Sequence, residues 1–479
     1  MPSMTSAAAS AVAEPAPSHV RDGLAAIATE IRFEDLPHKV VAKAKMLILD
    51  TVGCALGGLS GAPTRAVHAM VEALGGRPEA TIIGAQARTS CALATFANGT
   101  ALRYLDVNDY YFGRDPAHAS GNLAAILAVG EKSGASGRDI IAALVAAYEV
   151  QFRLCDHAGT PSLWDRGWHH ATNMSYASAA AAARLMGLDA ARTAEALAIA
   201  GTHGNILTES MRGRMATIKA TIEAVAAKGG VEAALMAAHG LTGPETIFEG
   251  AYGWDRAVAG GSDLPALAAP LDGTFRIMQA RIKPFEAFSP AQGLVQAALD
   301  LRARLSPQPE DIVAIEGRFP QQILDWPTSD GQKAAPTTKE LADHSPYYLM
   351  AVALMDGACG PAQFTPERLA DPVLRTLLAK ATLVADAAFT RDYHLGTGAA
   401  VTVTLRDGSK AEAVCPLPPG HPDNPLDDAA MARKFNEHAD PAVGAERARA
   451  IRDAIAGLDR ARDIRHLMGL LAAPAANAG

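Results

Sequence analysis

The stretch NGTALRYLDVNDYYFGRDPAHASGNL, at 98–123, gathers acids, an imidazole and tyrosines in a chain rich in alanine and leucine. Asp106 and Asp109 are the first and last residues of the DVND motif. His118 follows in DPAHASGN, just before an apolar segment that predicts a helix. The orphan N–H groups and the dipole of a helix N-terminus favour a bound anion there. The stretch is therefore either a solvated loop or the edge of an active site in which Asp106 and His118 face each other.

A second cluster, WDRGWHHATN at 164–173, places His169 and His170 beside tryptophans and before an alanine-rich segment that predicts a helix. An imidazole needs only a modest pKa shift to act as a general base near neutral pH, and a dry aromatic pocket supplies one. A capped helix start with one buried and one exposed histidine explains the same residues equally well.

Cations form a third group. ESMRGRMATIK, at 209–219, carries Arg212, Arg214 and Lys219, and RIKPF adds Lys283. Such residues suit a clamp for carboxylates. A solvated basic face is the more usual meaning of such a run.

The segment DHSPYYLMAVALMDG, at 343–357, contributes His344, Tyr347 and Tyr348. Its start is ordinary chemistry for a helix N-terminus, and tyrosines at helical spacing more often pack than react. Together the clusters offer acids, bases and cations, with no phosphate loop, dinucleotide fingerprint, nucleophilic cysteine or metal-ligand pattern in the sequence. We expect neither a cofactor nor a metal.

Composition narrows the class of partner. The chain has 479 residues, 49% of them hydrophobic, and a formal net charge of -8. This charge gives no general attraction for nucleic acid or anionic lipid, so we expect a small-molecule partner. The five cysteines are far apart, which fits a reducing compartment, and no segment predicts a signal peptide or a membrane span. A cytoplasmic protein is expected.

The elements around these clusters are mostly helices. Helical patterns start near residue 35 and recur at 119–133, 138–157, 172–186, 190–202 and 216–239. After residue 273 the pattern of residues changes. A strand is predicted at 311–319 and a hairpin with its turn at Asp407-Gly408 within 399–414. Helices are predicted at 290–304, 345–356 and 366–382.

The predicted fold class is mainly α, a large all-helical domain built from both ends of the chain with a smaller inserted α+β domain. The predicted boundaries are a disordered tail at 1–20, the helical domain at 21–272 and 416–471, the α+β domain at 273–415, and a tail at 472–479.

The order of the motifs resembles the MmgE/PrpD family, which includes 2-methylcitrate dehydratase and cis-aconitate decarboxylase. The motifs are LILDTVGCALGG, NGTALRYLDVND, HASGNLAAILAVGE, GWHHAT, AGTHGN, GLTGPETIFEG, RIKPF and DHSPYYLMAVALMDG. The resemblance covers about residues 20–470. It implies a homodimer, an α+β lid, and cofactor-free chemistry on di- or tricarboxylates between the domains, with active-site positions at Asp106, His118, His169, Lys219, Lys283 and Tyr348.

Departures from the family pattern bear on the substrate. Tyr110 stands where many members carry Thr, and Gly121 in HASGN replaces the Asp of HPSDN, which removes one carboxylate. His169, followed by His170, resembles decarboxylase-like members, whereas the spacer before His118 and the DYHLGTGAAVTVTLRDGS segment resemble the dehydratase branch.

These observations suggest a hydro-lyase. Lys219 and Lys283 would bind substrate carboxylates and stabilise the enolate-like charge, with Arg212, Arg214, Tyr110 and His170 as further binding residues. His118 or His169 would be the base, the other or Tyr348 the acid, and Asp106 would orient His118.

Several alternatives stay open. The same cations suit decarboxylation, or epimerisation of a dicarboxylate such as iminodisuccinate. A metal-dependent isoprenoid enzyme would use the DxxD motif. Such an enzyme needs a cavity lined by aromatic residues, and it is disfavoured because only 5% of the residues are aromatic. A helical scaffold with a decayed site is disfavoured because the candidate acids, bases and lysines are all present.

Overall fold

The computed structural model describes residues 19–211, 216–325, 331–393 and 398–473. The predicted tails lie outside these residues almost entirely, as do Arg212 and Arg214. The first helix, which the sequence did not predict, already begins at Val20, the last residue of the predicted tail.

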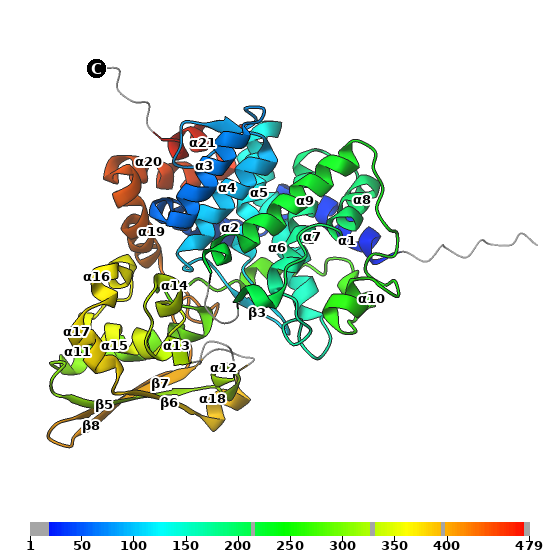
Figure 1. Ribbon diagram of the computed structural model, residues 1–479. Coiled ribbons are helices and arrows are strands. Elements are labelled where there is room, and N and C mark those ends of the chain that lie inside the picture. Colours follow the sequence, from blue (N-terminus) through cyan, green and yellow to red (C-terminus); the bar gives the residue numbers. More distant parts are fainter. Residues whose placement is uncertain (1–18, 212–215, 326–330, 394–397, 474–479) are drawn as a thin grey trace, which may run out of the picture.

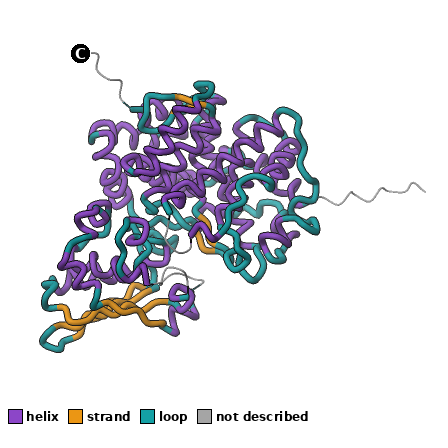
Figure 2. The backbone as a smooth tube through the Cα atoms, viewed as in Figure 1, coloured by secondary structure: helices purple, strands orange, loops and turns teal. Residues whose placement is uncertain are grey.

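Residues 20–267, a little over half of the chain, fold into packed helices (Figure 1, Figure 2). The helices are α1 (Val20–Glu30), α2 (His38–Gly57), α3 (Ala62–Leu74), α4 (Cys91–Tyr104), α5 (Asn122–Ser133), α6 (Gly137–Asp156), α7 (Met174–Leu185), α8 (Ala190–Ala200), α9 (Ile222–Ala238) and α10 (Leu264–Leu267). Two-residue strands pair as β1 (Ala80–Thr81) with β2 (Arg88–Thr89), and as β3 (Tyr111–Phe112) with β4 (Pro116–Ala117).

Helix α7 lies at the centre of this bundle. Its sequence MSYASAAAAARL is buried on almost every side, as expected for a helix that is apolar or small all round. It packs against α5, α6, α8 and α9, and alanine lets these backbones approach closely. The helices that carry the candidate residues are therefore held by one rigid core.

The α+β part contains a four-stranded sheet in the order β6-β5-β7-β8. Its elements are α11 (Gln292–Leu305), β5 (Ile312–Phe319), α12 (Gln321–Leu324), α13 (Gly331–Ala334), α14 (Lys339–Ala342), α15 (Pro346–Asp356), α16 (Pro366–Leu369), α17 (Pro372–Leu378), β6 (Ala381–Ala385), α18 (Ala387–Arg391), β7 (Ala399–Leu405) and β8 (Lys410–Cys415). Helices α11 and α15 pack together over the sheet, and the buried apolar residues from Ala287 to Cys415 form their own core.

The predicted hairpin is present, with β7 antiparallel to β8 and Gly408 at φ 85° in the turn. The helix predicted over 366–382 is divided into α16 and α17 and is wrong at its end. It stops at Leu378, and β6 begins at Ala381 and runs parallel to β5. The β-branched residues of ATLVA favour a strand once β5 offers an unpaired edge.

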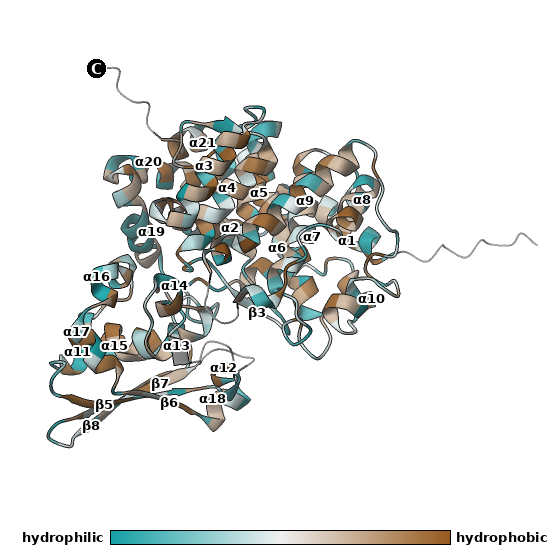
Figure 3. Ribbon diagram, viewed as in Figure 1, coloured by the Kyte–Doolittle hydropathy of each residue, from teal (hydrophilic) through white to brown (hydrophobic). Residues whose placement is uncertain are grey.

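After β8 the chain returns to the helical part as α19 (Asp428–Val443), α20 (Ala445–Ala456) and α21 (Arg465–Leu471). Helix α19, largely hydrophilic on its visible face in Figure 3, packs its apolar side on α2. A Cβ added at Gly53 would lie 3.1 Å from the Phe435 ring, so the glycine permits this approach. The two ends of the chain thus share one core, separate from that of the sheet.

Among the described residues, none of the helices combines the length and the apolar character needed to cross a bilayer.

Candidate active site

Asp106 lies two residues beyond α4, with φ 58° in the left-handed region that L-residues rarely adopt. Asp is among the few side chains that tolerate this region. Its carboxylate is buried and accepts hydrogen bonds from Lys219 Nζ at 2.9 Å and Lys283 Nζ at 2.8 Å. Arg103 Nη1 lies 2.6 Å from the same carboxylate. Three cations therefore meet one carboxylate away from water.

These cations come from separate segments. Lys219 lies in the 3-10 helix η6 (Thr217–Thr221), just before α9. Lys283 follows a backbone bridge in which Tyr110 and Arg281 exchange N–H···O bonds of 2.8 and 2.9 Å. This bridge ties the loop after Asp106 to the segment that carries Lys283.

A histidine from the α+β part completes the group. His344 Nε2 lies 3.3 Å from the Asp106 carboxylate, and its Nδ1 lies 3.3 Å from Lys219 Nζ and contacts Asp343. Lys339 in turn donates to Asp343 at 2.6 Å. We call Asp106, Lys219, Lys283, Arg103 and His344 the cationic cluster. It joins the two parts of the molecule.

The charges in this cluster shift one another's pKa. Burial disfavours the Asp106 carboxylate, but Arg103, Lys219 and Lys283 outweigh it and hold the pKa of Asp106 well below its usual range. Burial, partly offset by Asp106, lowers the pKa of Lys283 to about 8. Burial and then Lys219 lower the pKa of His344 to about 4, against the pull of Asp343. His344 is therefore a neutral imidazole near pH 7.

A second group consists of His118, His169, His170 and Trp164, which we call the imidazole cluster. The ring centroids of His169 and His170 are 4.0 Å apart, and those of His118 and His170 are 5.1 Å apart. Trp164 lies with its ring centroid 5.0 Å from that of His169. Both histidines of the HH pair are buried, so the alternative explanation with one buried and one exposed histidine is wrong.

The tautomer of His118 follows from its partner. Nδ1 lies 2.6 Å from the backbone carbonyl of Asp109, which can only accept, so Nδ1 carries the hydrogen and Nε2 keeps a lone pair. The expectation that Asp106 orients His118 is wrong, because the Asp106 carboxylate is engaged in the cationic cluster. The two acids of DVND have different partners: Asp109 accepts from Ser120 N and the Tyr148 hydroxyl.

Burial keeps the imidazole cluster neutral. Together with nearby cations, it lowers the pKa of His118 and of His169 well below the usual range, and that of His170 to about 3. His169 Nδ1 accepts from Ala171 N at 3.1 Å, which fixes its ring at the start of the 3-10 helix η4 (His170–Asn173). Neutral imidazoles with free lone pairs are bases.

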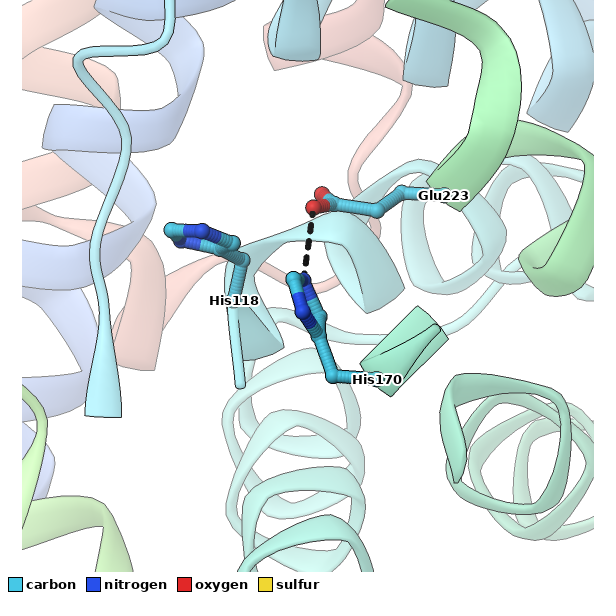
Figure 4. Close-up of side chains that lie close together, drawn as sticks. All are labelled: His118, His170 and Glu223. Carbon is cyan, nitrogen blue, oxygen red and sulfur yellow. Dashed lines mark ion pairs between the residues drawn. The ribbon is translucent and has the colours of Figure 1, made fainter. Parts of the chain in front are cut away.

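Arg103 connects the two clusters through Glu223, in the first turn of α9. Arg103 Nε donates to Glu223 Oε1 at 2.8 Å, and His170 Nε2 lies 3.7 Å from the same oxygen. Figure 4 shows the Glu223 carboxyl group directed toward the rings of His118 and His170. Sequence reasoning missed Arg103 and Glu223, and it named His344 without giving it a role.

Two sets of donor atoms are close enough to consider as metal ligands. Each set lies within 4.8 Å: His118, His170 and Glu223 in one, and Asp106, Asp343 and His344 in the other. Ammonium groups already contact the acids of the second set, and Arg103 contacts Glu223 in the first, which disfavours a further cation.

Tyr348 is not brought to these clusters. Its hydroxyl donates to the Gln363 carbonyl inside the α+β core, and its ring packs near Phe364. Tyr110 is buried, and its ring faces the Arg281 guanidinium and the Phe112 edge. A role for either residue toward a substrate stays a prediction.

A C-terminal residue supports the loop that carries Asp106. Lys434, on α19, donates to the Val107 carbonyl at 2.8 Å and contacts the Asp50 carboxylate on α2. The residue next to Asp106 is thus held by both ends of the chain.

Two family models match this chain, the MmgE/PrpD N-terminal domain over residues 22–266 and the MmgE/PrpD C-terminal domain over residues 285–460. The chain belongs to the MmgE/PrpD family. The resemblance drawn from the motifs is confirmed, and the matched ranges span both the helical part and the α+β part.

Curated members of the MmgE/PrpD family with similar sequences carry two kinds of name. A cis-aconitate decarboxylase-like protein of Aspergillus oryzae is 26% identical over 92% of this chain and 95% of its own length. The 2-methylcitrate dehydratase of Cupriavidus necator is 29% identical over 79% of this chain and 81% of its own length. The human cis-aconitate decarboxylase is 26% identical over 93% and 92%.

Proposed function

We propose that this protein is a lyase for a small di- or tricarboxylic acid, with elimination of water as its reaction, as in a 2-methylcitrate dehydratase. One observation carries the proposal: Lys219, Lys283 and Arg103 converge in a buried region next to the neutral, lone-pair-bearing imidazole of His118.

The cations would bind and polarise the substrate. A substrate carboxylate that reaches Lys219 and Lys283 shares them with Asp106, and their charge is strong in a site from which water is excluded. When a proton leaves the carbon next to that carboxylate, the same ammonium groups stabilise the enolate-like charge that develops. Because the clusters are buried, substrate enters only after a local opening of the structure.

His118 is the proposed base. Its Nδ1–H is fixed on the Asp109 carbonyl, so Nε2 is the atom that takes the proton from carbon. Proton transfer by a positioned imidazole contributes about 10²- to 10⁴-fold in rate. The names of the relatives support a lyase in general.

Decarboxylation is the second candidate. Two relatives with a cis-aconitate decarboxylase name match 92% and 93% of this chain, and the imidazole cluster contains His169 at the position that resembles the decarboxylase branch. In this reaction the cations would stabilise the charge left when carbon dioxide departs, and a protonated side chain of the site would return a proton to carbon.

The test is NMR of products from citrate, 2-methylcitrate, cis-aconitate and iminodisuccinate in deuterated water. Loss of water supports the first candidate, and loss of carbon dioxide supports the second. Isotope exchange without net change indicates epimerisation. Lys219→Ala should remove the activity, whereas Lys228→Ala, a surface control paired with Glu232, should retain it. Turnover of none of the four acids would contradict the proposal.

All the groups invoked are side chains, so we propose that no metal or other cofactor takes part. Activity after dialysis against EDTA checks this proposal, and a loss that zinc or iron restores would overturn it. A homodimer, expected from the resemblance, is checked by light scattering.

A further inference from the structure

Glu223 is a carboxyl group that the proposed reaction has not yet used. It is 1% exposed and lies in the first turn of α9, between the cationic and imidazole clusters. Oε1 accepts from Arg103, whereas Oε2 is buried without a hydrogen-bond partner among the described residues. Both ring nitrogens of the adjacent His170 are also buried without such a partner. Buried polar atoms normally have partners, so these atoms mark a place where a ligand or a transferred proton belongs.

Gly121 leaves the room for this carboxyl group. A Cβ added at Gly121 would lie 3.2 Å from Glu223 Oε2 and would press on the end of the Met174 side chain. The position at which the motif HASGN lacks a carboxylate thus faces a carboxyl group supplied by α9.

The site has a base but still needs an acid. His118 presents the Nε2 lone pair, and the donor atoms of His118, His170 and Glu223 lie within 4.8 Å of one another. Neither acid predicted from the sequence fills this role: burial lowers the pKa of His169, which leaves it neutral, and the Tyr348 hydroxyl donates its hydrogen to the Gln363 carbonyl.

We infer that Glu223 is the general acid of the site, which protonates the hydroxyl group as it leaves the substrate. This inference rests on the proposed function and deepens it, because it assigns the two proton transfers to two different residues, His118 and Glu223.

The step balances as follows. His118 Nε2 takes the proton from carbon, and the C–H electron pair forms the new carbon–carbon double bond. The C–O bond breaks toward oxygen, and that oxygen takes the proton of the Glu223 carboxyl group to leave as water. His118 is then an imidazolium and Glu223 a carboxylate. Transfer of the proton from His118 to Glu223, for which His170 lies between them, restores both groups.

The environment of the groups agrees with these roles. Burial raises the pKa of Glu223, although Arg103 opposes the shift. Burial lowers the pKa of His118 and of His170. The raised pKa favours the protonated form of Glu223, and the lowered pKa values favour the unprotonated imidazoles. This separation of pKa values is expected for a general acid and a general base.

The first experiment separates the two proton transfers. Glu223→Gln keeps an oxygen that accepts from Arg103 but has no acidic proton. With the acid that the wild type dehydrates, we expect water loss to fall about 10²- to 10⁴-fold while exchange of the carbon-bound hydrogen with deuterated water continues. The matched control is Glu131→Gln, a buried glutamate on α5 that contacts Arg88, and it should keep full turnover. Equal loss of exchange and elimination, or unchanged elimination, overturns the inference.

The second experiment needs no substrate. Infrared difference spectra of wild type against Glu223→Gln, recorded from pH 5 to 8, should show the carbonyl band of one protonated carboxylic acid. Absence of that band overturns the inference. If the wild type turns over none of the four acids, the proposed function fails by itself, and this spectrum alone decides whether Glu223 holds a proton.

Discussion

Lys283 Nζ donates to Asp106 twice, at 2.8 Å to the carboxylate and at 2.9 Å to the backbone carbonyl. The lysine side chain is completely buried. It pairs with the negative charge of Asp106 and also bonds the backbone of this residue, which is in the left-handed conformation. Much of the behaviour of the site depends on this pair.

Replacement of this lysine by an apolar side chain of similar length should be costly. Lys283→Met leaves the Asp106 carboxylate with two of its three cations, and loss of one partner of a buried ion pair costs about 3 kcal/mol in the free energy of unfolding. Urea denaturation measures the change. Lys228→Ala, at an exposed pair, should cost less than about 1 kcal/mol. Equal effects of the two substitutions would contradict the importance of the buried pair.

The charge on Lys283 also predicts a pH limit on activity. Because its pKa is lowered to about 8, the ammonium form is present below that pH and is lost above it. We expect kcat/KM for a polycarboxylate to fall as pH rises through about 8. Lys283→Arg, whose guanidinium stays charged, should move the alkaline limb upward. If the alkaline limb of the pH profile does not move in this variant, another group is responsible for it.

Asp106→Asn removes the anion from the cationic cluster while its side chain still tolerates the left-handed conformation. Lys219, Lys283 and Arg103 then lack their shared counter-ion. We expect a less stable protein whose melting temperature rises more with added citrate than that of the wild type, because the ligand supplies the missing negative charge. Differential scanning fluorimetry with and without citrate measures this. An equal rise in both proteins would refute the expectation.

Glu286 should make stability fall as pH rises. Its side chain is 1% exposed, and burial raises its pKa to about 8 from an ordinary value of 4.5, although Lys339 opposes the shift. Between these values the native protein keeps a proton that the unfolded chain releases, so this group contributes stability below pH 4.5 that is lost progressively up to about 8. Glu286→Gln removes this dependence.

The free energy of unfolding of Glu286→Gln, relative to wild type, should therefore rise between pH 5 and pH 8 by about 1 kcal/mol per pH unit. Urea titrations at both pH values give the comparison. A difference that is the same at both pH values would show that Glu286 titrates normally.

Tyr348→Phe distinguishes packing from catalysis. Because the hydroxyl group donates to the Gln363 carbonyl within the α+β core, we expect a loss of about 1 kcal/mol in stability and little change in kcat. A drop of more than about a hundredfold in kcat at unchanged stability would restore the catalytic role predicted from the sequence.

The sequence predicted α2 and α5 to α9 well because alanine-rich apolar segments with clear stop signals have few alternatives, whereas it gave no bounds for α1, α3 and α4. Helix α2, for example, starts directly after Pro37 and ends at Gly57. Strand β6 was missed because only pairing with β5, more than 60 residues away, makes ATLVA a strand.

The candidate site was predicted in part. The motifs pointed to Asp106, Lys219, Lys283 and the histidines, which the structure gathers into two buried clusters. Arg103 could have been found, since it precedes Asp106 by three residues at the end of a helix. Glu223 could not, because it is 120 residues from Arg103. His344 was named but given no role, because its Asp-His-Ser-Pro segment is also a normal helix start, in which Ser345 does cap α15.

The contact of Lys434 with the Val107 carbonyl has a consequence for biosynthesis. Roughly nine tenths of the polypeptide must leave the ribosome before this lysine can reach the loop next to Asp106. The loop therefore stays without this anchor until synthesis is nearly complete, and messages truncated ahead of codon 434 encode proteins in which that loop lacks its C-terminal support.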